Sequence, residues 1–213
     1  MSRLNYSLTI SAIVFVTLLA TAACAIPSAV TSPKRFVAID SLAVRQAVDD
    51  ALAQTAYTNK YDPAYVKLTY PNGDVPRETG VCADVVIRAL RKGNLDLQQS
   101  VHEDMLHDFA AYPRLWGLAK PDPNIDHRRV PNLMRFFERQ KQSLPVTHDP
   151  QDYQPGDVVA WDVGGNHPHI GILSNAVCAD SPLRYCVVHN IGAGARLEDV
   201  LFSWQIIGHY RPF

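Results

Sequence analysis

The fold of this chain is decided by the stretch Glu78-Thr79-Gly80-Val81-Cys82-Ala83-Asp84-Val85-Val86-Ile87-Arg88-Ala89-Leu90. It predicts a turn followed by a helix, with Thr79 capping the helix by accepting a hydrogen bond from the amide of Cys82. The helix has a stripe of apolar residues that recur at helical spacing, namely Val85, Val86, Ala89 and Leu90. Cys82 lies at the N-terminal end of this stripe, where free amides and the helix dipole favour a thiolate.

The composition is that of an ordinary folded domain. The chain has 213 residues, of which 47% are hydrophobic and 19% are charged, which suits one domain after removal of a leader. Arg3 is the only charge before residue 26, so 19 of the 20 basic residues remain beyond it, against 21 acidic ones, a net charge of −2. Such a chain has no basic field to attract nucleic acid, and we expect no nucleic-acid partner.

The N-terminal 25 residues have the pattern of a secretory signal. Arg3 precedes a mostly apolar run at 8–20, which is too short for a membrane-spanning helix, and small residues follow at 21–25. We predict a signal peptide at 1–25, a tether at 26–40 and a single domain at 41–213, located in the periplasm or cell envelope of a bacterium. Residues 19–24 also resemble a lipoprotein box with Cys24 as a lipid anchor, but Thr21 matches that box poorly and simple secretion is preferred.

Three cysteines remain beyond the leader: Cys82, Cys178 and Cys186. In an oxidising compartment an odd number suggests one disulfide and one free thiol. Cys178 and Cys186 flank a short loop with turn signals, so we predict that they form the disulfide. A free cysteine such as Cys82 is often only a small buried side chain. A catalytic interpretation of Cys82 therefore depends on residues farther along the chain.

Helices come first in the chain and strands second. We expect helices at 42–52, 82–92, 97–109 and 131–142, and strands at 66–70, 158–161, 169–173, 185–189 and 204–210. The first helix is expected to be capped by Ser41, and Pro131 suits the first turn of the fourth. This order predicts an α+β fold in which helices pack against an antiparallel sheet.

Two histidines occupy corresponding places on neighbouring predicted strands, His169 and His189. A cysteine nucleophile needs a base, and the base needs an orienting partner. Strands joined by a hairpin can hold these side chains side by side. If both project from the face packed on the cysteine helix, Cys82 is the nucleophile, His169 the base and His189 the orienting residue. The helix N-terminus and a neighbouring imidazolium then predict a thiolate ion-paired with His169 below neutral pH.

The order of these motifs resembles that of NlpC-type papain-like cysteine hydrolases, which cut amide bonds in cell-wall peptides. The matching stretches are Gly80-Val81-Cys82, Pro155-Gly156-Asp157-Val158-Val159, His169-Ile170-Gly171-Ile172 and Val188-His189-Asn190. The resemblance implies a papain-like (NlpC-type) fold, the same three catalytic residues, no cofactor, and peptidoglycan stem peptides as substrates. The sequence departs from the usual pattern where Ala83-Asp84 follow the cysteine and where a long helical insertion precedes the sheet.

A closer resemblance covers nearly all of 61–213. The chain is similar to the YijF-like family of secreted bacterial proteins, a domain of unknown function. The matching stretches are Tyr70-Pro71-Asn72-Gly73-Asp74, Gly80-Val81-Cys82, Asp126-His127-Arg128-Arg129-Val130-Pro131-Asn132 and His189-Asn190-Ile191-Gly192. This likeness identifies the family, and the activity follows only by analogy.

Several polar residues are candidates for binding a substrate. An arginine can hold a carboxylate with two hydrogen bonds, so the polar loop Asp126, His127, Arg128 and Arg129 suits wall peptides, unless it pairs internally with acids of 98–109. Tyr70 is a candidate oxyanion donor by the resemblance, with a strand tyrosine as the alternative, and the amide of Cys82 is another donor. Asp84 either contributes to binding or pairs with Arg88. Asn190 is an alternative partner for His169.

Two other functions remain open at the level of sequence. His167 and His169 flank Pro168 and, with His189, could supply three nitrogens to zinc in a metal-dependent hydrolase. An inactive module that only binds cell-wall peptides is the other. Alkylation of the thiol and chelation of metal distinguish the cysteine hydrolase from the metal-dependent hydrolase. Turnover distinguishes both enzymes from the binding module.

Overall fold

The computed structural model describes Met1, Ile39 and residues 41–213. The predicted signal peptide, the lipid-anchor alternative at Cys24 and the tether fall almost wholly outside these residues. From Ile39 onward the described residues belong to one compact unit, Lys34–Phe213. Within the described part of the chain, no helix combines the length and apolar character needed to cross a membrane.

Four α-helices form where the apolar periodicity predicted them. They are α1 (Leu42–Gln54), α2 (Cys82–Lys92), α3 (Leu97–His107) and α4 (Val130–Arg139). Ser41 caps α1 by accepting a hydrogen bond from the amide of Val44, and Pro131 lies in the first turn of α4, as expected. Three short 3₁₀ turns lie at Phe109–Ala111, Asp126–Arg128 and Pro150–Asp152.

The C-terminal half forms a five-stranded antiparallel sheet. Its strands are β3 (Val158–Asp162), β4 (Pro168–Cys178), β5 (Ser181–Asn190), β6 (Ala195–Glu198) and β7 (Gln205–Tyr210), in the order β6-β5-β4-β3-β7. The sequence did not predict β6. Two residues each in β1 (Lys60–Tyr61) and β2 (Thr79–Gly80) form a separate parallel pair.

The strand predicted at 66–70 was wrong, because this segment has no partner strand. Its backbone is held by side chains instead: the amide of Leu68 donates to Asn124 Oδ1 at 2.8 Å, and the carbonyl of Thr69 accepts from Gln98 Nε2 at 2.8 Å. These side chains satisfy polar backbone groups that a sheet would otherwise pair. The segment is therefore an extended loop fixed by long-range contacts.

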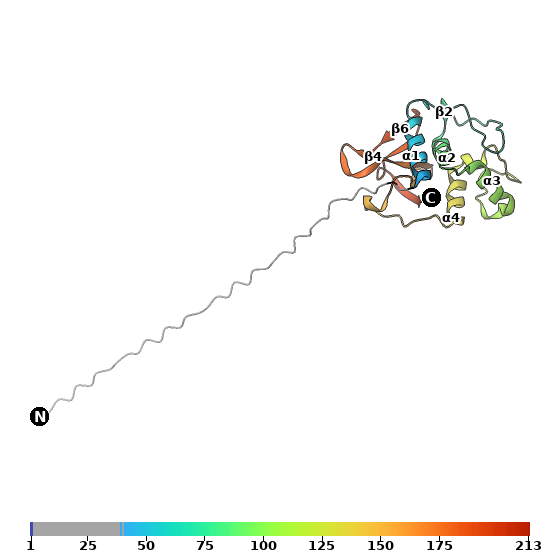
Figure 1. Ribbon diagram of the computed structural model, residues 1–213. Helices are drawn as coiled ribbons and strands as arrows, with labels where there is room; N and C mark the ends of the chain where they lie inside the picture. Colours follow the sequence, from blue (N-terminus) through green and yellow to red (C-terminus); the bar gives the residue numbers. More distant parts are fainter. Residues whose placement is uncertain (2–38, 40) are drawn as a thin grey trace. The chain divides into compact units, whose positions relative to one another are not determined.

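The two faces of the sheet pack against different groups of residues. On one face Ile170, Ile172 and Val188 join the helix residues, including Cys82, in the main core. On the other face Trp161 and Leu173 belong to a second cluster with Val187, Leu201 and Tyr153. In Figure 1 α1 and α2 lie beside the strands, and α3 and α4 lie farther from the sheet. The predicted α+β arrangement of helices on an antiparallel sheet is confirmed.

The predicted disulfide is also confirmed. Cys178 at the end of β4 bonds to Cys186 on β5, with an S–S distance of 2.05 Å. The short connection between β4 and β5 brings these two cysteines together. Cys82 remains as the free thiol among the described residues.

Candidate active site

The N-terminus of α2 is capped differently from the prediction. Thr79 lies in β2 and its hydroxyl donates to the carbonyl of Pro76 at 3.0 Å, so it does not cap the helix. Val81 is the N-cap residue, and its amide donates to Asp84 Oδ2 at 2.6 Å. Asp84 therefore holds the backbone immediately before Cys82. The predicted cap was wrong because the helix begins at Cys82, three residues beyond Thr79.

The thiol of Cys82 is buried, with 5% of the residue exposed. Burial raises the pKa of the Cys82 thiol to about 11, although the amides of Ile170, Ala83 and Cys82 itself favour the thiolate. Desolvation therefore outweighs the helix N-terminus, because a charge is strongly disfavoured away from water. The sequence predicted a thiolate below neutral pH, whereas burial keeps the Cys82 thiol protonated in the resting site.

The sulfur lies where β4 and β5 part from each other. The amide of Leu173 donates to Asp157 at 2.9 Å, on the β3 side of β4. Because backbone groups alternate along a strand, the amide of Ile170 points to the β5 side. The paired residues of β4 and β5 end at Ile172 and Val188, so β5 does not pair with this amide. The amide of Ile170 faces the Cys82 sulfur instead, which places the thiol at the end of the β4–β5 ladder.

The sequence-based hypothesis placed both histidines on the sheet face that packs on α2. In the structure they project from the opposite face. His169 lies directly opposite Trp161 on β3, and their rings are 5.9 Å apart. Trp161 belongs to the second cluster, so His169 projects from the face away from the helix. His189 projects from the same face, because its ring contacts that of His169. The assumption failed because successive strand residues point to opposite faces, and Ile170 takes the helix-facing position.

The two rings form a hydrogen-bonded chain that ends on a carboxylate. Nε2 of His169 lies 2.9 Å from Nδ1 of His189, and Nε2 of His189 lies 2.8 Å from Glu198 Oε2. Trp204 packs edge-on against both rings. Burial lowers the pKa of His169 to about 3, with the charge on His189 as the second cause. Burial also lowers the pKa of His189, although Glu198 opposes this shift. Both rings are therefore neutral near pH 7.

The structure thus places the predicted catalytic residues at the same end of β4 and β5 but on opposite faces of the sheet. The thiol reaches the end of the β4–β5 ladder from the helix side, at the amide of Ile170. The His169 and His189 rings are joined across the same two strands from the opposite face. Within residues 41–213, no hydrogen bond joins the Cys82 sulfur to either ring. Glu198 is an additional member of the chain that the sequence did not indicate, because β6 was not predicted.

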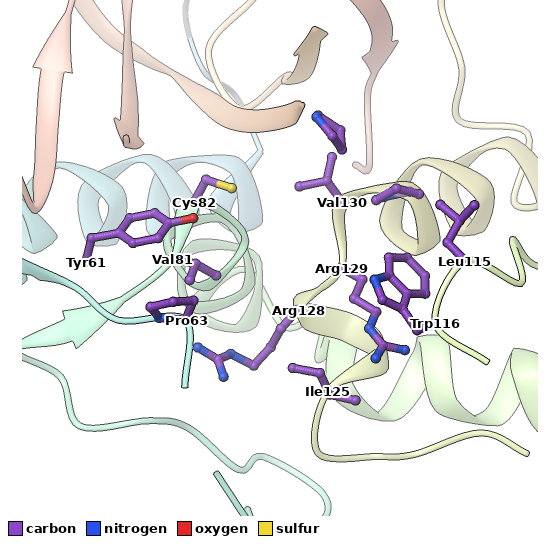
Figure 2. A pocket seen from close by; sticks show the side chains of 12 residues that line it. Tyr61, Pro63, Val81, Cys82, Leu115, Trp116, Ile125, Arg128, Arg129 and Val130 are labelled. Carbon is purple, nitrogen blue, oxygen red and sulfur yellow. The ribbon is translucent and has the colours of Figure 1, made fainter. Parts of the chain in front are cut away.

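Cys82 lines an open pocket of about 410 Å³ (Figure 2). Tyr61, Pro63 and Val81 lie on the same side as Cys82, and Leu115, Trp116 and Arg129 lie across from them. Arg129 stacks over the Trp116 ring, with its guanidinium carbon 4.1 Å from the ring centroid. The pocket therefore combines a thiol, an apolar wall and a guanidinium.

Tyr61 is the tyrosine beside the thiol, and the sequence analysis missed it. In Figure 2 its hydroxyl end lies next to Cys82. Burial raises the pKa of Tyr61, and the charges on Cys82 and Asp84 raise it further. Tyr70, the predicted candidate, is 44% exposed, packs edge-on against the His102 ring and does not line this pocket. The pairing of Tyr61 with Gly80 brings Tyr61 close to Cys82, and this contact has no sequence signature.

Arg128 makes four hydrogen bonds within the protein. It holds both oxygens of Asp84, at 2.8 and 2.9 Å, and donates to the carbonyls of Ala64 and Asp62. Asp84 and Arg128 are both buried. The predicted pair of Asp84 with Arg88 was wrong, because Arg88 bonds to Asp74 at 2.8 Å. Arg128 also lines the pocket beside Cys82, but its internal hydrogen bonds use four of its five N–H donors.

The other predicted binding residues are also mostly internal. Asp126 is 1% exposed and accepts hydrogen bonds from the amide of Asp122 and from Arg129. His127 is buried, and burial lowers its pKa to about 4. Asn190 donates to the carbonyl of Gly80 at 2.9 Å, so it supports the turn before Cys82 and does not orient His169. Among the described residues, Arg129 has one ion pair, with Asp126 at 3.4 Å, and it lines the pocket.

The three histidines of the zinc alternative do not converge. His169 and His189 use Nε2 and Nδ1 to bond each other. His167 is exposed, and its Nδ1 lies 2.8 Å from the carbonyl of Gly164 in the preceding turn. The described residues contain no group of three His, Cys, Asp or Glu side chains arranged to hold a metal ion. The three-histidine site is therefore not assembled.

Alkylation of Cys82 should be slow at pH 6 and should accelerate as the pH rises above 8. Only the thiolate reacts, and a raised pKa makes the thiolate scarcer at every pH below it. Iodoacetamide labelling of the purified protein, followed by peptide mass analysis between pH 5 and 10, measures this profile. The 178–186 disulfide provides an unreactive internal reference. Fast labelling that is independent of pH between 5 and 8 would show instead the ion pair that the sequence suggested.

Comparisons with known proteins agree over most of the domain. A family model described as a domain of unknown function, DUF1287, matches residues 48–212. The uncharacterized protein YijF of Escherichia coli (strain K12) is 56% identical over 166 residues. This match covers 78% of the present chain and 80% of the relative. The predicted YijF-like family is thus confirmed.

Proposed function

This chain belongs to the DUF1287 family, and we propose that it is an exported cysteine amidase or peptidase of papain-like type that acts on peptidoglycan peptides. The observation that carries the proposal is the hydrogen-bonded series His169–His189–Glu198. Its first residue, His169, directly precedes Ile170, whose amide faces the Cys82 sulfur, although the His169 ring and the thiol lie on opposite faces of the sheet. A buried thiol, a neutral imidazole and an orienting acceptor are the components of nucleophilic catalysis.

The reaction begins with a neutral thiol and a neutral base. In the resting structure His169 and Cys82 lie on opposite faces of the sheet, so the mechanism requires substrate binding to turn the His169 ring toward the sulfur. The carbonyl carbon then meets Cys82, whose proton passes to His169 as the sulfur attacks. The resulting imidazolium donates that proton to the leaving amine, and the C–N bond breaks to give a thioester. Water then attacks the thioester, His169 takes a proton from it, and the acid product leaves as the thiol re-forms.

The pocket offers groups to stabilise the developing oxyanion. The hydroxyl of Tyr61 lies beside Cys82, and the amide of Cys82 is at the N-terminus of α2. Donors of this kind are most effective in a site from which water is excluded. We therefore assign Tyr61, in place of Tyr70, as the side-chain oxyanion donor.

Arg129 is the group that suits a substrate carboxylate. Its guanidinium lines the pocket with Cys82 and stacks on Trp116. An arginine with a single 3.4 Å ion pair retains donors for a ligand. Peptidoglycan stem peptides carry free carboxylates, and export across the inner membrane would bring the protein to them.

Digestion of purified muropeptides tests the proposal directly. The mature protein and its Cys82→Ser variant are incubated with muropeptides, and the products are identified by mass. We expect the wild type to add one water to a defined amide bond and the variant to leave the substrate intact. EDTA should change neither result. Binding without turnover by the wild type would favour the cell-wall-peptide binding module, and turnover that survives Cys82→Ser but not EDTA would favour a metal mechanism.

A further inference from the structure

We infer that Glu198, acting through His189, fixes the positions of the protons in the histidine chain so that His169 keeps its free lone pair on Nδ1. The proton positions follow from the hydrogen-bond geometry of the two rings and from their burial. Their consequence for the rate rests on the proposed function. Glu198 is on this account a positioning residue, because it contacts neither the thiol nor the substrate pocket directly.

The inference starts at the carboxylate. At neutral pH a glutamate side chain accepts hydrogen bonds and does not donate them. Oε2 of Glu198 lies 2.8 Å from Nε2 of His189, so this nitrogen must carry the proton. Because burial lowers the pKa of His189, the ring is neutral and carries only one proton. Its Nδ1 is therefore an acceptor.

The second hydrogen bond then has one possible direction. Nδ1 of His189 lies 2.9 Å from Nε2 of His169, and an acceptor at this distance requires a donor opposite it. His169 must therefore carry its proton on Nε2. Burial lowers the pKa of His169 to about 3, so this ring is neutral too, and its Nδ1 keeps the lone pair. A base needs that lone pair to accept the thiol proton.

The sheet holds this chain in place. Glu198 pairs with Val187 between β6 and β5, so its side chain shares a face with His189, two residues farther along β5. Trp161 and Trp204 pack against the His169 ring and Trp204 packs against the His189 ring. The rings are almost wholly buried, whereas the Glu198 side chain is 47% exposed. A solvated carboxylate thus sets the protonation of two rings that water does not reach.

Without the carboxylate, the two directions of the His169–His189 hydrogen bond become comparable. In the reversed direction Nδ1 of His189 donates to Nε2 of His169. The single N–H proton of His169 is then on Nδ1. The base then has no lone pair on that nitrogen. A glutamine at 198 can impose this state, because its amide N–H₂ can donate to Nε2 of His189.

Nitrogen-detected NMR of the mature protein, labelled on histidine, tests the proton positions without any substrate. We expect both rings to carry their proton on Nε2 in the wild type, and Glu198→Gln to move at least part of the population to Nδ1. Glu138→Gln is the matched control, because Glu138 is in an exposed ion pair with Arg135 on α4. This control should leave both rings unchanged. A wild-type His169 protonated on Nδ1 would overturn the inference.

The rate provides a second readout. Glu198→Gln should lower kcat by about 10²- to 10⁴-fold with little change in KM, the upper value being the effect of a wrong histidine tautomer in a serine-protease triad. Glu138→Gln should keep the wild-type rate. Unchanged kcat in Glu198→Gln would refute the positioning role. Nε2 protonation of both rings in a wild type that hydrolyses nothing would uphold the proton assignment and reject the proposed function instead.

Discussion

Cys82→Ala, His169→Ala and the double variant should all hydrolyse the substrate at the same residual rate, about 10⁴- to 10⁶-fold below the wild type. In the proposed mechanism the thiol and the base act as one unit, because the sulfur does not attack until His169 takes its proton. Removing either group therefore removes the whole step, and removing the second adds nothing. Steady-state kinetics on the muropeptide that the wild type cleaves, with circular dichroism to confirm folding, measures the effect.

His189→Ala serves as the graded comparison for this prediction. His189 bonds to His169 but does not touch the sulfur, so its loss should lower the rate less than the loss of His169. A double variant whose loss equals the product of the two single losses would show that Cys82 and His169 act independently. That result would contradict the mechanism, and so would full activity in Cys82→Ala.

Asp84→Ala should destabilise the folded protein by about 3–5 kcal/mol, the usual effect of leaving one partner of a buried ion pair uncompensated. Both oxygens of Asp84 hold Arg128, and Oδ2 also accepts from the Val81 amide. For a domain of this size, such a loss lowers Tm by about 6–20 °C. The double variant Asp84→Leu with Arg128→Met should recover most of this stability, because no buried charge remains. About 1 kcal/mol should still be missing, since the helix cap is lost.

Two controls separate this stability effect from substrate binding. Glu138→Ala breaks an exposed ion pair and should change the free energy of unfolding by less than about 1 kcal/mol. In the proposed function, Arg129→Ala should have a small effect on Tm but should raise KM more than it lowers kcat, because Arg129 lines the pocket and its ion pair with Asp126 is long, at 3.4 Å. Thermal unfolding gives the first quantity and kinetics the second. An unchanged Tm in Asp84→Ala would show that the buried pair does not support the fold.

The polar loop 126–129 shows how far residue type alone can guide a functional prediction. Four polar residues between apolar helices suggested a substrate clamp, and one of them, Arg129, lines the pocket and stacks on Trp116. Its neighbour Arg128 points inward to Asp84, although both are arginines in the same turn. The difference arises because Arg128 meets a carboxylate from α2, 44 residues away in sequence, which no local pattern reveals.

The sequence by itself determined the elements whose causes are local. The apolar spacing after Cys82 predicted α2, Ser41 predicted the start of α1, and the short hairpin loop predicted the Cys178–Cys186 disulfide. It also determined the α+β class and the family. In each case the decisive residues lie within a few positions of one another, so periodicity, capping and turn chemistry are sufficient.

Only the tertiary structure decided what surrounds the thiol. It placed His169 on the face away from α2, brought Tyr61 to Cys82 through β1 and β2, and added Glu198 from β6. The physical reason is that these positions depend on strand register, and a shift of one residue reverses the face of every side chain. The protonation of the thiol was likewise decided by burial, which the helix N-terminus alone did not predict.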